Sequence, residues 1–376
     1  MIVFRKNFLL FSFLNASLFI VFIIAQFCVD PFCFWHKHWF KGQHYEAPEV
    51  LLNIGLLKNF LRNNDEYDTI LISTSHMKTT YADEIASSVK SNKKALKFCL
   101  PGGMPIEFET MMRKALKLGN VKNVVFGFEL DSFSKPAYTP HQYREFPYQL
   151  YKNNYLIFFN YLNIVHTLKF CFHMPPDATI GEYPFNDLNS LWFHYWFEFY
   201  QKKHRKFLSE IVEKKKYFKL KIDDRTYSDY KDFSAINRHL LPILKENPHV
   251  NFYIIIIPYS VLYFGQGNRY DYKIYSNIQK YLIEKIENLK NVKVFGFFDC
   301  SFVVNIANYY DYTHFHPNIN KYILYCISNN LHILNRKNFD NYEKNAIENL
   351  KTFHFKDYYN IKEVDSFESI IKSNNK

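Results

Sequence analysis

Two stretches of the chain alternate short apolar runs with segments of helical spacing, and this alternation constrains the fold more than any other feature. Runs rich in β-branched and aromatic residues predict strands at 68–72, 95–100, 121–128, 250–257 and 292–297. Apolar residues recurring every three or four positions predict helices at 51–61, 82–91, 105–118, 236–245, 272–289 and 318–334. Short, fully apolar strands separated by helices are typical of a parallel sheet covered by helices. We therefore predict an α/β domain over residues 45–334 that binds ligands beyond the carboxyl ends of its strands.

The alternation fails between residues 135 and 230, which are rich in Phe, Tyr, Trp and Lys. Helical patches at 149–170 and 191–215 predict that this segment is a helical cap inserted into the domain. Residues 335–376 are polar and charged, and we expect a tail with one helix at 342–350.

An almost uninterrupted apolar run occupies residues 8–29. At about 1.5 Å of rise per residue it is long enough to span a bilayer core as a helix. A cleaved signal peptide is the alternative, but the run exceeds the usual h-region and no small-x-small site follows it. We therefore predict an N-terminal membrane anchor over residues 1–30. Arg5 and Lys6 favour a cytoplasmic amino terminus, which places the rest of the chain on the periplasmic side of an inner membrane.

Composition excludes some classes of function. The 376-residue chain has a formal charge of +11, but its Lys residues are scattered and no nucleic-acid motif focuses them. We expect no nucleic-acid partner.

The six cysteines show neither CxxC nor metal-ligand spacing, and the chain has no dinucleotide or phosphate-binding fingerprint. We accordingly predict no cofactor and no metal.

Two distant stretches carry candidate catalytic side chains. Ser75 follows the strand at 68–72, and Asp311 and His314 lie three positions apart late in the chain. A serine hydroxyl becomes a good nucleophile when an imidazole takes its proton, and a carboxylate fixes the tautomer of that imidazole. We predict Ser75 as nucleophile, His314 as base and Asp311 as its orienting carboxylate. The backbone N–H groups of Ser75 and Gly102, at neighbouring strand ends, are the predicted oxyanion donors.

Each of these residues has a simpler interpretation. A serine after a strand commonly caps a helix, so Ser75 alone indicates little. His316 is an alternative base, and Asp311, His314 and His316 are an alternative set of metal ligands. Glu129, which follows the third predicted strand, is expected to be a solvated loop carboxylate.

The order of these motifs resembles the SGNH/GDSL hydrolase superfamily, and in particular its membrane-anchored bacterial branch related to envelope-glycan acylation proteins. The superfamily's serine-containing block is similar to Ile72-Ser73-Thr74-Ser75-His76 in this chain. Its glycine-containing block is similar to Pro101-Gly102-Gly103-Met104-Pro105. The last block resembles Tyr310-Asp311-Tyr312-Thr313-His314-Phe315-His316-Pro317, where the base matches His314. Pro258-Tyr259-Ser260 is similar to a recurrent turn of these proteins.

The resemblance implies a flavodoxin-like, three-layer αβα domain and an esterase or acyltransferase that acts on acyl groups, chiefly acetyl groups, of an envelope glycan. It also implies an acylated saccharide as partner, and a membrane protein that donates the acyl group as a further one. Two positions depart from the family pattern. Ser73 replaces a usual glycine, and 127–132 contains no counterpart of the asparagine in the third block. These departures motivate the alternative of a catalytically silent envelope protein that binds glycan or a membrane partner.

Overall fold

The computed structural model describes residues 2–30, 57, 65–100, 102–118, 120–134, 164–165, 167–168, 171, 232–265, 271–309, 311–354 and 364–374. The chain divides into two compact units, Met1–Asn63 with His141–Glu182 and Asn64–Pro140 with Tyr183–Lys376. The helix predicted at 51–61 and most of the predicted cap at 135–230 lie outside the described residues.

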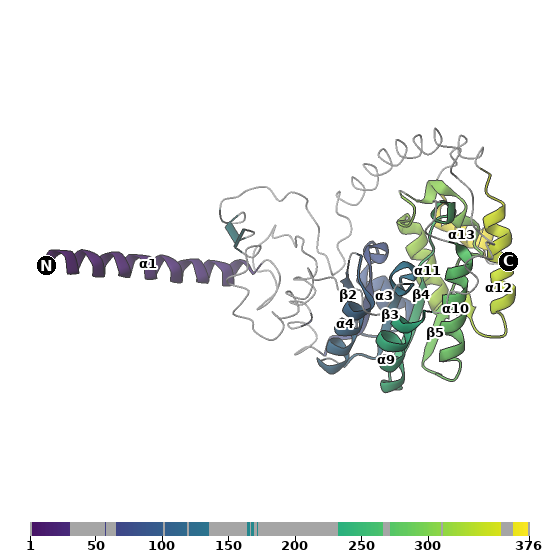
Figure 1. Cartoon of the computed structure of the whole chain (residues 1–376), viewed down its shortest axis with the longest axis horizontal. Helices are drawn as coiled ribbons and strands as arrows, with labels where there is room; N and C mark the ends of the chain where they lie inside the picture. Colours follow the sequence, from purple (N-terminus) through teal and green to yellow (C-terminus); the bar gives the residue numbers. More distant parts are fainter. Residues whose placement is uncertain are drawn as a thin grey trace. The chain divides into compact units, whose positions relative to one another are not determined.

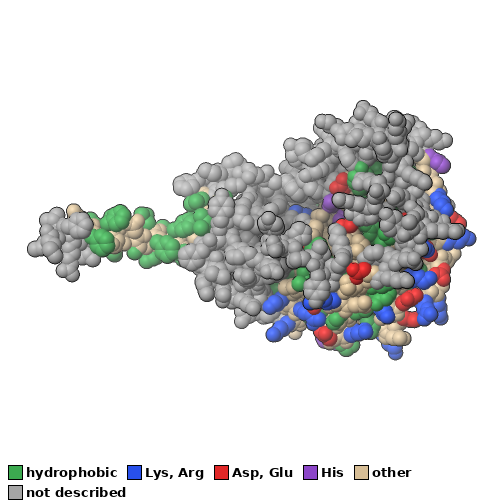
Figure 2. Space-filling model, viewed as in Figure 1, with side chains coloured by type: hydrophobic (Ala, Val, Ile, Leu, Met, Phe, Trp, Pro, Cys, Tyr) green, Lys and Arg blue, Asp and Glu red, His purple; other side chains and the backbone are tan. Residues whose placement is uncertain are grey.

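The first unit contains helix α1 (Ile2–Val29). Its segment Leu10–Val29 is 20 residues long and apolar enough to cross a membrane. Large apolar side chains are exposed at consecutive positions, so they face outward around the helix (Figure 2). An exposed surface of this kind is stable in lipid rather than in water, which is compatible with the predicted anchor.

The second unit is built on a six-stranded sheet with the order β2-β1-β3-β4-β5-β6 (Figure 1). The strands are β1 (Tyr67–Ser73), β2 (Lys94–Cys99), β3 (Asn123–Phe128), β4 (Asn251–Ile256), β5 (Val292–Phe295) and β6 (Ile333–Leu334). The first five run parallel, and β6 pairs antiparallel with β5. The parallel order 2-1-3-4-5 is that of doubly wound sheets, which bind ligands at the carboxyl ends of their strands.

Helices lie between the strands and after β6. They are α3 (Ala82–Ser88), α4 (Pro105–Leu118), α5 (Leu130–Phe133), α9 (Leu241–Glu246), α10 (Tyr272–Ile286), α11 (Pro317–Asn329), α12 (Phe339–Lys351) and α13 (Phe367–Asn374). Short turns of 3₁₀-helix lie at η2 (Ser75–Met77), η7 (Val261–Gly265), η9 (Ser301–Val303) and η10 (Ile306–Asn308). α11 packs against α3 and α13, while α4 packs against α9. A mostly parallel sheet with helices packed around it confirms the predicted α/β class.

Three expectations about helices differ from the structure. The tail, expected to have one helix at 342–350, has two, α12 and α13; the second forms where buried Ile370 lets the chain pack against α11. The helix predicted at 318–334 ends at Asn329, because Asn330 adopts a left-handed conformation (φ 55°) and its N–H caps the carbonyls of Cys326 and Ile327. The reversed chain then forms the edge strand β6. The helix predicted at 236–245 starts as a π-helical turn, η6 (Ile236–Leu240), before α9. Pro242 lacks the N–H that a regular helix requires, which explains the wide turn.

Interior polar contacts hold the loop after β1 in place. The Lys97 side chain in β2 is fully buried, and its ammonium donates to the backbone carbonyls of Lys78 (3.1 Å) and Thr80 (2.7 Å). Because a buried ammonium without partners is costly, this arrangement fixes the loop that begins at Ser75.

Candidate active site

Ser75 and His314 meet across 239 residues of sequence. β1 ends at Ser73, and Ser75 begins the short turn η2 at the carboxyl edge of the sheet. Its Oγ lies 2.7 Å from Nε2 of His314. This is hydrogen-bond distance, and it allows the hydroxyl proton to pass to the imidazole.

Asp311 orients the imidazole from the same loop. Its Oδ2 lies 2.7 Å from His314 Nδ1, and its Oδ1 accepts from the backbone N–H groups of Thr313 (2.8 Å) and His314 (2.7 Å). Burial alone would raise the pKa of Asp311, but the hydrogen bond and charge of His314 lower it to about 2. The ionised carboxylate can only accept, so Nδ1 carries the proton and Nε2 accepts from Ser75.

The turn containing Pro258, Tyr259 and Ser260 supports the Asp311–His314 loop. The Ser260 N–H donates to the carbonyl of Tyr312 (3.0 Å). The Tyr309 hydroxyl, just before the loop, donates to the carbonyl of Pro258 (3.1 Å). Both bonds attach the loop to the end of β4, and so to the rigid sheet.

His316 has a different position. Its Nδ1 accepts from the backbone N–H of Asn318 (3.2 Å), which makes His316 the N-cap of α11. The structure therefore brings His314, rather than His316, to Ser75. Asp311, His314 and His316 do not point at a common centre, since the first two bind each other and the third caps a helix.

The predicted oxyanion donors follow adjacent strands. Ser73 of β1 pairs with Cys99 of β2, so Ser75 and Gly102 both lie just beyond the same edge. Gly102 has a positive φ of 57°, a conformation that glycine adopts without strain. The following residue is held by a hydrogen bond from the Ser132 hydroxyl to the carbonyl of Gly103 (2.7 Å). The predicted donors thus lie on two neighbouring loops at the carboxyl edge.

Sequence reasoning missed a second histidine–carboxylate pair beside the first. Glu129, expected to be solvated, is 6% exposed. Its Oε2 accepts from the Thr74 hydroxyl (2.9 Å) and lies 2.9 Å from His76 Nδ1. Burial would raise the pKa of Glu129, but the charge and hydrogen bonds of His76 and Thr74 lower it below its ordinary value. The expectation was wrong because β3 is the sheet neighbour of β1, so its carboxyl end faces the residues that flank Ser75.

His76 also contacts the imidazole of His314 directly. The rings of His76 and His314 stack with centroids 4.4 Å apart and planes inclined by 16°. Glu129 thereby positions His76, and His76 in turn supports one face of the His314 ring.

Ser73 and Gly127 fit each other across β1 and β3. A Cβ placed on Gly127 would overlap the Ser73 side chain. The glycine at 127 therefore provides the space that the Ser73 side chain occupies.

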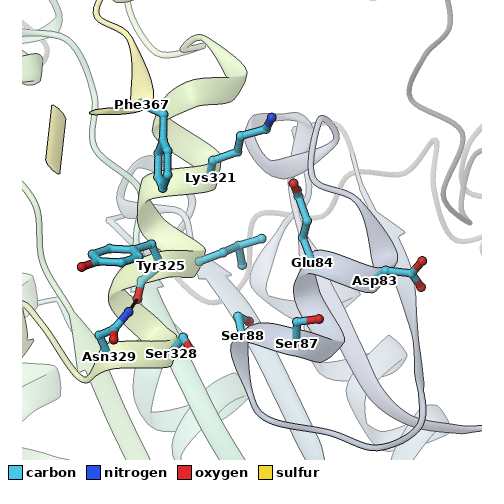
Figure 3. A pocket seen from close by; sticks show the side chains of 10 residues that line it. Asp83, Glu84, Ser87, Ser88, Lys321, Tyr325, Ser328, Asn329 and Phe367 are labelled. Atoms are coloured by element: carbon cyan, nitrogen blue, oxygen red, sulfur yellow. Dashed lines mark hydrogen bonds between the residues drawn. The ribbon is translucent and has the colours of Figure 1, made fainter. Parts of the chain in front are cut away.

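A groove of about 560 Å³ lies between α3 and α11 and is closed at one end by Phe367 of α13 (Figure 3). Asp83 and Glu84 of α3 and Lys321 of α11 line it. None of the residues predicted for catalysis lines this groove, and we assign it no catalytic role.

The fold and the site together define a class of protein. It is a doubly wound α/β domain that carries a hydrogen-bonded serine–histidine–aspartate triad at the carboxyl edge of its sheet. The chain matches no family model, no curated protein and no solved structure. A functional assignment therefore rests on the geometry of these side chains and on the motif resemblance.

Proposed function

We propose that this protein is a membrane-anchored, SGNH-like serine esterase or acyltransferase. The observation that carries the proposal is the pair of 2.7 Å contacts linking Ser75 Oγ to His314 Nε2 and His314 Nδ1 to Asp311 Oδ2. A hydroxyl, an imidazole and a carboxylate hydrogen-bonded in this order are the arrangement that a nucleophile, a base and an orienting group require.

The first half of the reaction forms an acyl-enzyme. Ser75 Oγ attacks the ester carbonyl while His314 Nε2 takes the hydroxyl proton, and Asp311 stabilises the resulting imidazolium. The backbone N–H groups of Ser75 and Gly102 bind the negative oxygen of the tetrahedral intermediate. The intermediate collapses with loss of the alcohol oxygen, which receives its proton from His314.

The second half returns the enzyme to its starting state. Water or a sugar hydroxyl loses its proton to His314 and attacks the acyl group on Ser75. The tetrahedral intermediate then breaks its bond to Ser75 Oγ, which takes the proton back from His314, and the acyl group leaves on the attacking oxygen. Water gives hydrolysis, and a sugar hydroxyl gives transfer. Both outcomes use the same three side chains, so the triad supports either reaction.

We assign the site to the periplasmic side of an inner membrane. α1 has the length and exposed apolar surface of a membrane span, and the predicted orientation leaves the sheet domain outside the cytoplasm. Envelope glycans that carry acyl, chiefly acetyl, esters are the proposed substrate class, with a membrane protein as acyl donor if the enzyme is a transferase. The motif resemblance supports this choice of substrate.

Hydrolysis of p-nitrophenyl acetate by the full chain in detergent micelles tests the proposal. We expect the wild type to release p-nitrophenol and Ser75→Ala to reduce turnover to background. The Ser87→Ala variant is a matched control in the same domain and should retain activity. Hydrolysis that survives unchanged in Ser75→Ala would reject the assignment, and an inactive, folded wild type would favour the catalytically silent alternative.

A further inference from the structure

A second cluster of reactive side chains lies at the carboxyl end of β5. Asp299 and Cys300 follow that strand, and His332 comes immediately before β6. The Gly296 N–H donates to the carbonyl of His332 (3.1 Å), which fastens the two segments together. β1 and β5 are three strand spacings apart in the sheet, about 14 Å, so this cluster is separate from the triad.

The three potential ligand atoms form an almost equilateral triangle. Cys300 Sγ lies 3.8 Å from Asp299 Oδ1 and 4.0 Å from His332 Nδ1, and the third side, from His332 Nδ1 to Asp299 Oδ1, is 3.9 Å. A point equidistant from all three is about 2.3 Å from each atom, close to zinc–sulfur, zinc–nitrogen and zinc–oxygen bond lengths of about 2.0–2.3 Å.

The histidine is held in the orientation that metal binding requires. Its Nε2 lies 2.8 Å from the hydroxyl of Tyr322, which can accept the Nε2 proton and leave Nδ1 free to bind a metal. His332 also adopts a left-handed backbone conformation, with φ 57°. A left-handed backbone is unfavourable for a residue other than glycine, so the surrounding structure must hold His332 in this position.

The three side chains are largely shielded from solvent. Cys300 is 1% exposed, and the side chains of Asp299 and His332 are 23% and 14% exposed. A zinc ion would bind Asp299 as a carboxylate and Cys300 as a thiolate. A divalent cation would stabilise the charged forms of both groups, and binding would release their protons to solvent.

We propose that Asp299, Cys300 and His332 form a Zn²⁺ site, with water as the fourth ligand. A thiolate, an imidazole and a carboxylate together suit zinc better than magnesium or calcium, which prefer oxygen ligands alone. The bound ion joins the end of β5 to the α11–β6 loop and stabilises the antiparallel edge of the sheet. Linear spacing could not reveal the site, because its ligands come from two separate elements that meet only in the fold.

Co²⁺ and Zn²⁺ binding to the chelator-stripped full chain in detergent micelles tests this site. We expect one equivalent of Co²⁺ to produce a thiolate-to-cobalt absorption band that Zn²⁺ displaces. Zn²⁺ at about 100 times its dissociation constant should raise the Tm by roughly 5–10 °C. The chain has 15 His and 6 Cys residues, so stoichiometry alone does not identify the ligands.

Variants identify them. Cys300→Ser should abolish the thiolate band, while His332→Gln and Asp299→Asn should each weaken Zn²⁺ affinity at least tenfold. The partly exposed His332 and Asp299 variants provide the test if Cys300→Ser does not fold. Cys99→Ala removes a buried thiol at the end of β2 and should leave the band unchanged. Absence of the band in the wild type, its survival in Cys300→Ser, or full affinity in the other two variants would overturn the proposal.

Discussion

Asp311→Asn separates the catalytic role of this carboxylate from its structural role. In the wild type, Oδ2 holds the proton of His314 on Nδ1, so Nε2 accepts from Ser75. An amide can turn its NH₂ group toward Nδ1, which places the imidazole proton on Nε2 and prevents it from accepting the Ser75 proton. We expect kcat/KM for p-nitrophenyl acetate to fall about 10⁴-fold, equivalent to about 5.5 kcal/mol of transition-state stabilisation.

The expected loss of stability is much smaller. Folding lowers the pKa of Asp311 from 3.8 to about 2. A shift of about two units corresponds to about 2.5 kcal/mol, but the side chain is 39% exposed, so solvent screening reduces this to about 1 kcal/mol. Because the folded-state pKa is depressed, this contribution is present above pH 4 and is lost as the pH falls toward 2.

Urea unfolding and ester hydrolysis measured on the same samples test both magnitudes. Asp311→Asn should be about 1 kcal/mol less stable than the wild type at pH 7, and the difference should shrink toward pH 2. Comparing the two proteins cancels the acid response of the remaining carboxylates. A kcat/KM within tenfold of the wild type would refute the orienting role of Asp311, and a large stability loss would show that the residue is mainly structural.

Three further predictions concern the surroundings of the triad. His314→Ala should lower ester hydrolysis by about 10⁴-fold or more, while His316→Ala retains most of it; an equal loss in both would contradict the choice of base. Gly127→Ala should cost about 1–3 kcal/mol in chemical denaturation because its Cβ overlaps Ser73, and adding Ser73→Gly should restore most of that loss; no rescue would refute the paired fit. Glu129→Gln should cost about 1–3 kcal/mol because it removes the buried carboxylate that contacts His76 and Thr74, and unfolding free energies equal to the wild type would show that the carboxylate does not stabilise the fold there.

Much of the fold could be predicted because the strands are buried on both faces. β1 and β3 are continuous buried runs with polar or small residues at their ends, so their approximate positions follow from apolar character alone. β6 was not predictable, since it has two residues and depends on the left-handed turn at Asn330. The helix signal continues through that turn, because residues 331, 333 and 334 remain apolar.

The triad was accessible from sequence because its members stand at strand ends or in one short loop. Ser75 follows an apolar run, and Asp311 is close enough along the chain to orient His314. The pair formed by Glu129 and His76 was not accessible, because it depends on β3 lying beside β1 in the sheet. A neighbour order of that kind emerges from crossover connections between elements, and residue spacing does not encode it.

Labelling with a fluorophosphonate probe tests the central claim most directly. Such a probe reacts covalently with a serine that a neighbouring base has activated, and the modified peptide can be located by mass spectrometry. The 2.7 Å contact between Ser75 Oγ and His314 Nε2 predicts modification at Ser75, with no labelling of Ser75→Ala and strongly reduced labelling of His314→Ala. Folded wild-type protein that remains unlabelled, or that is labelled at another serine, would contradict the assignment of Ser75 as the nucleophile.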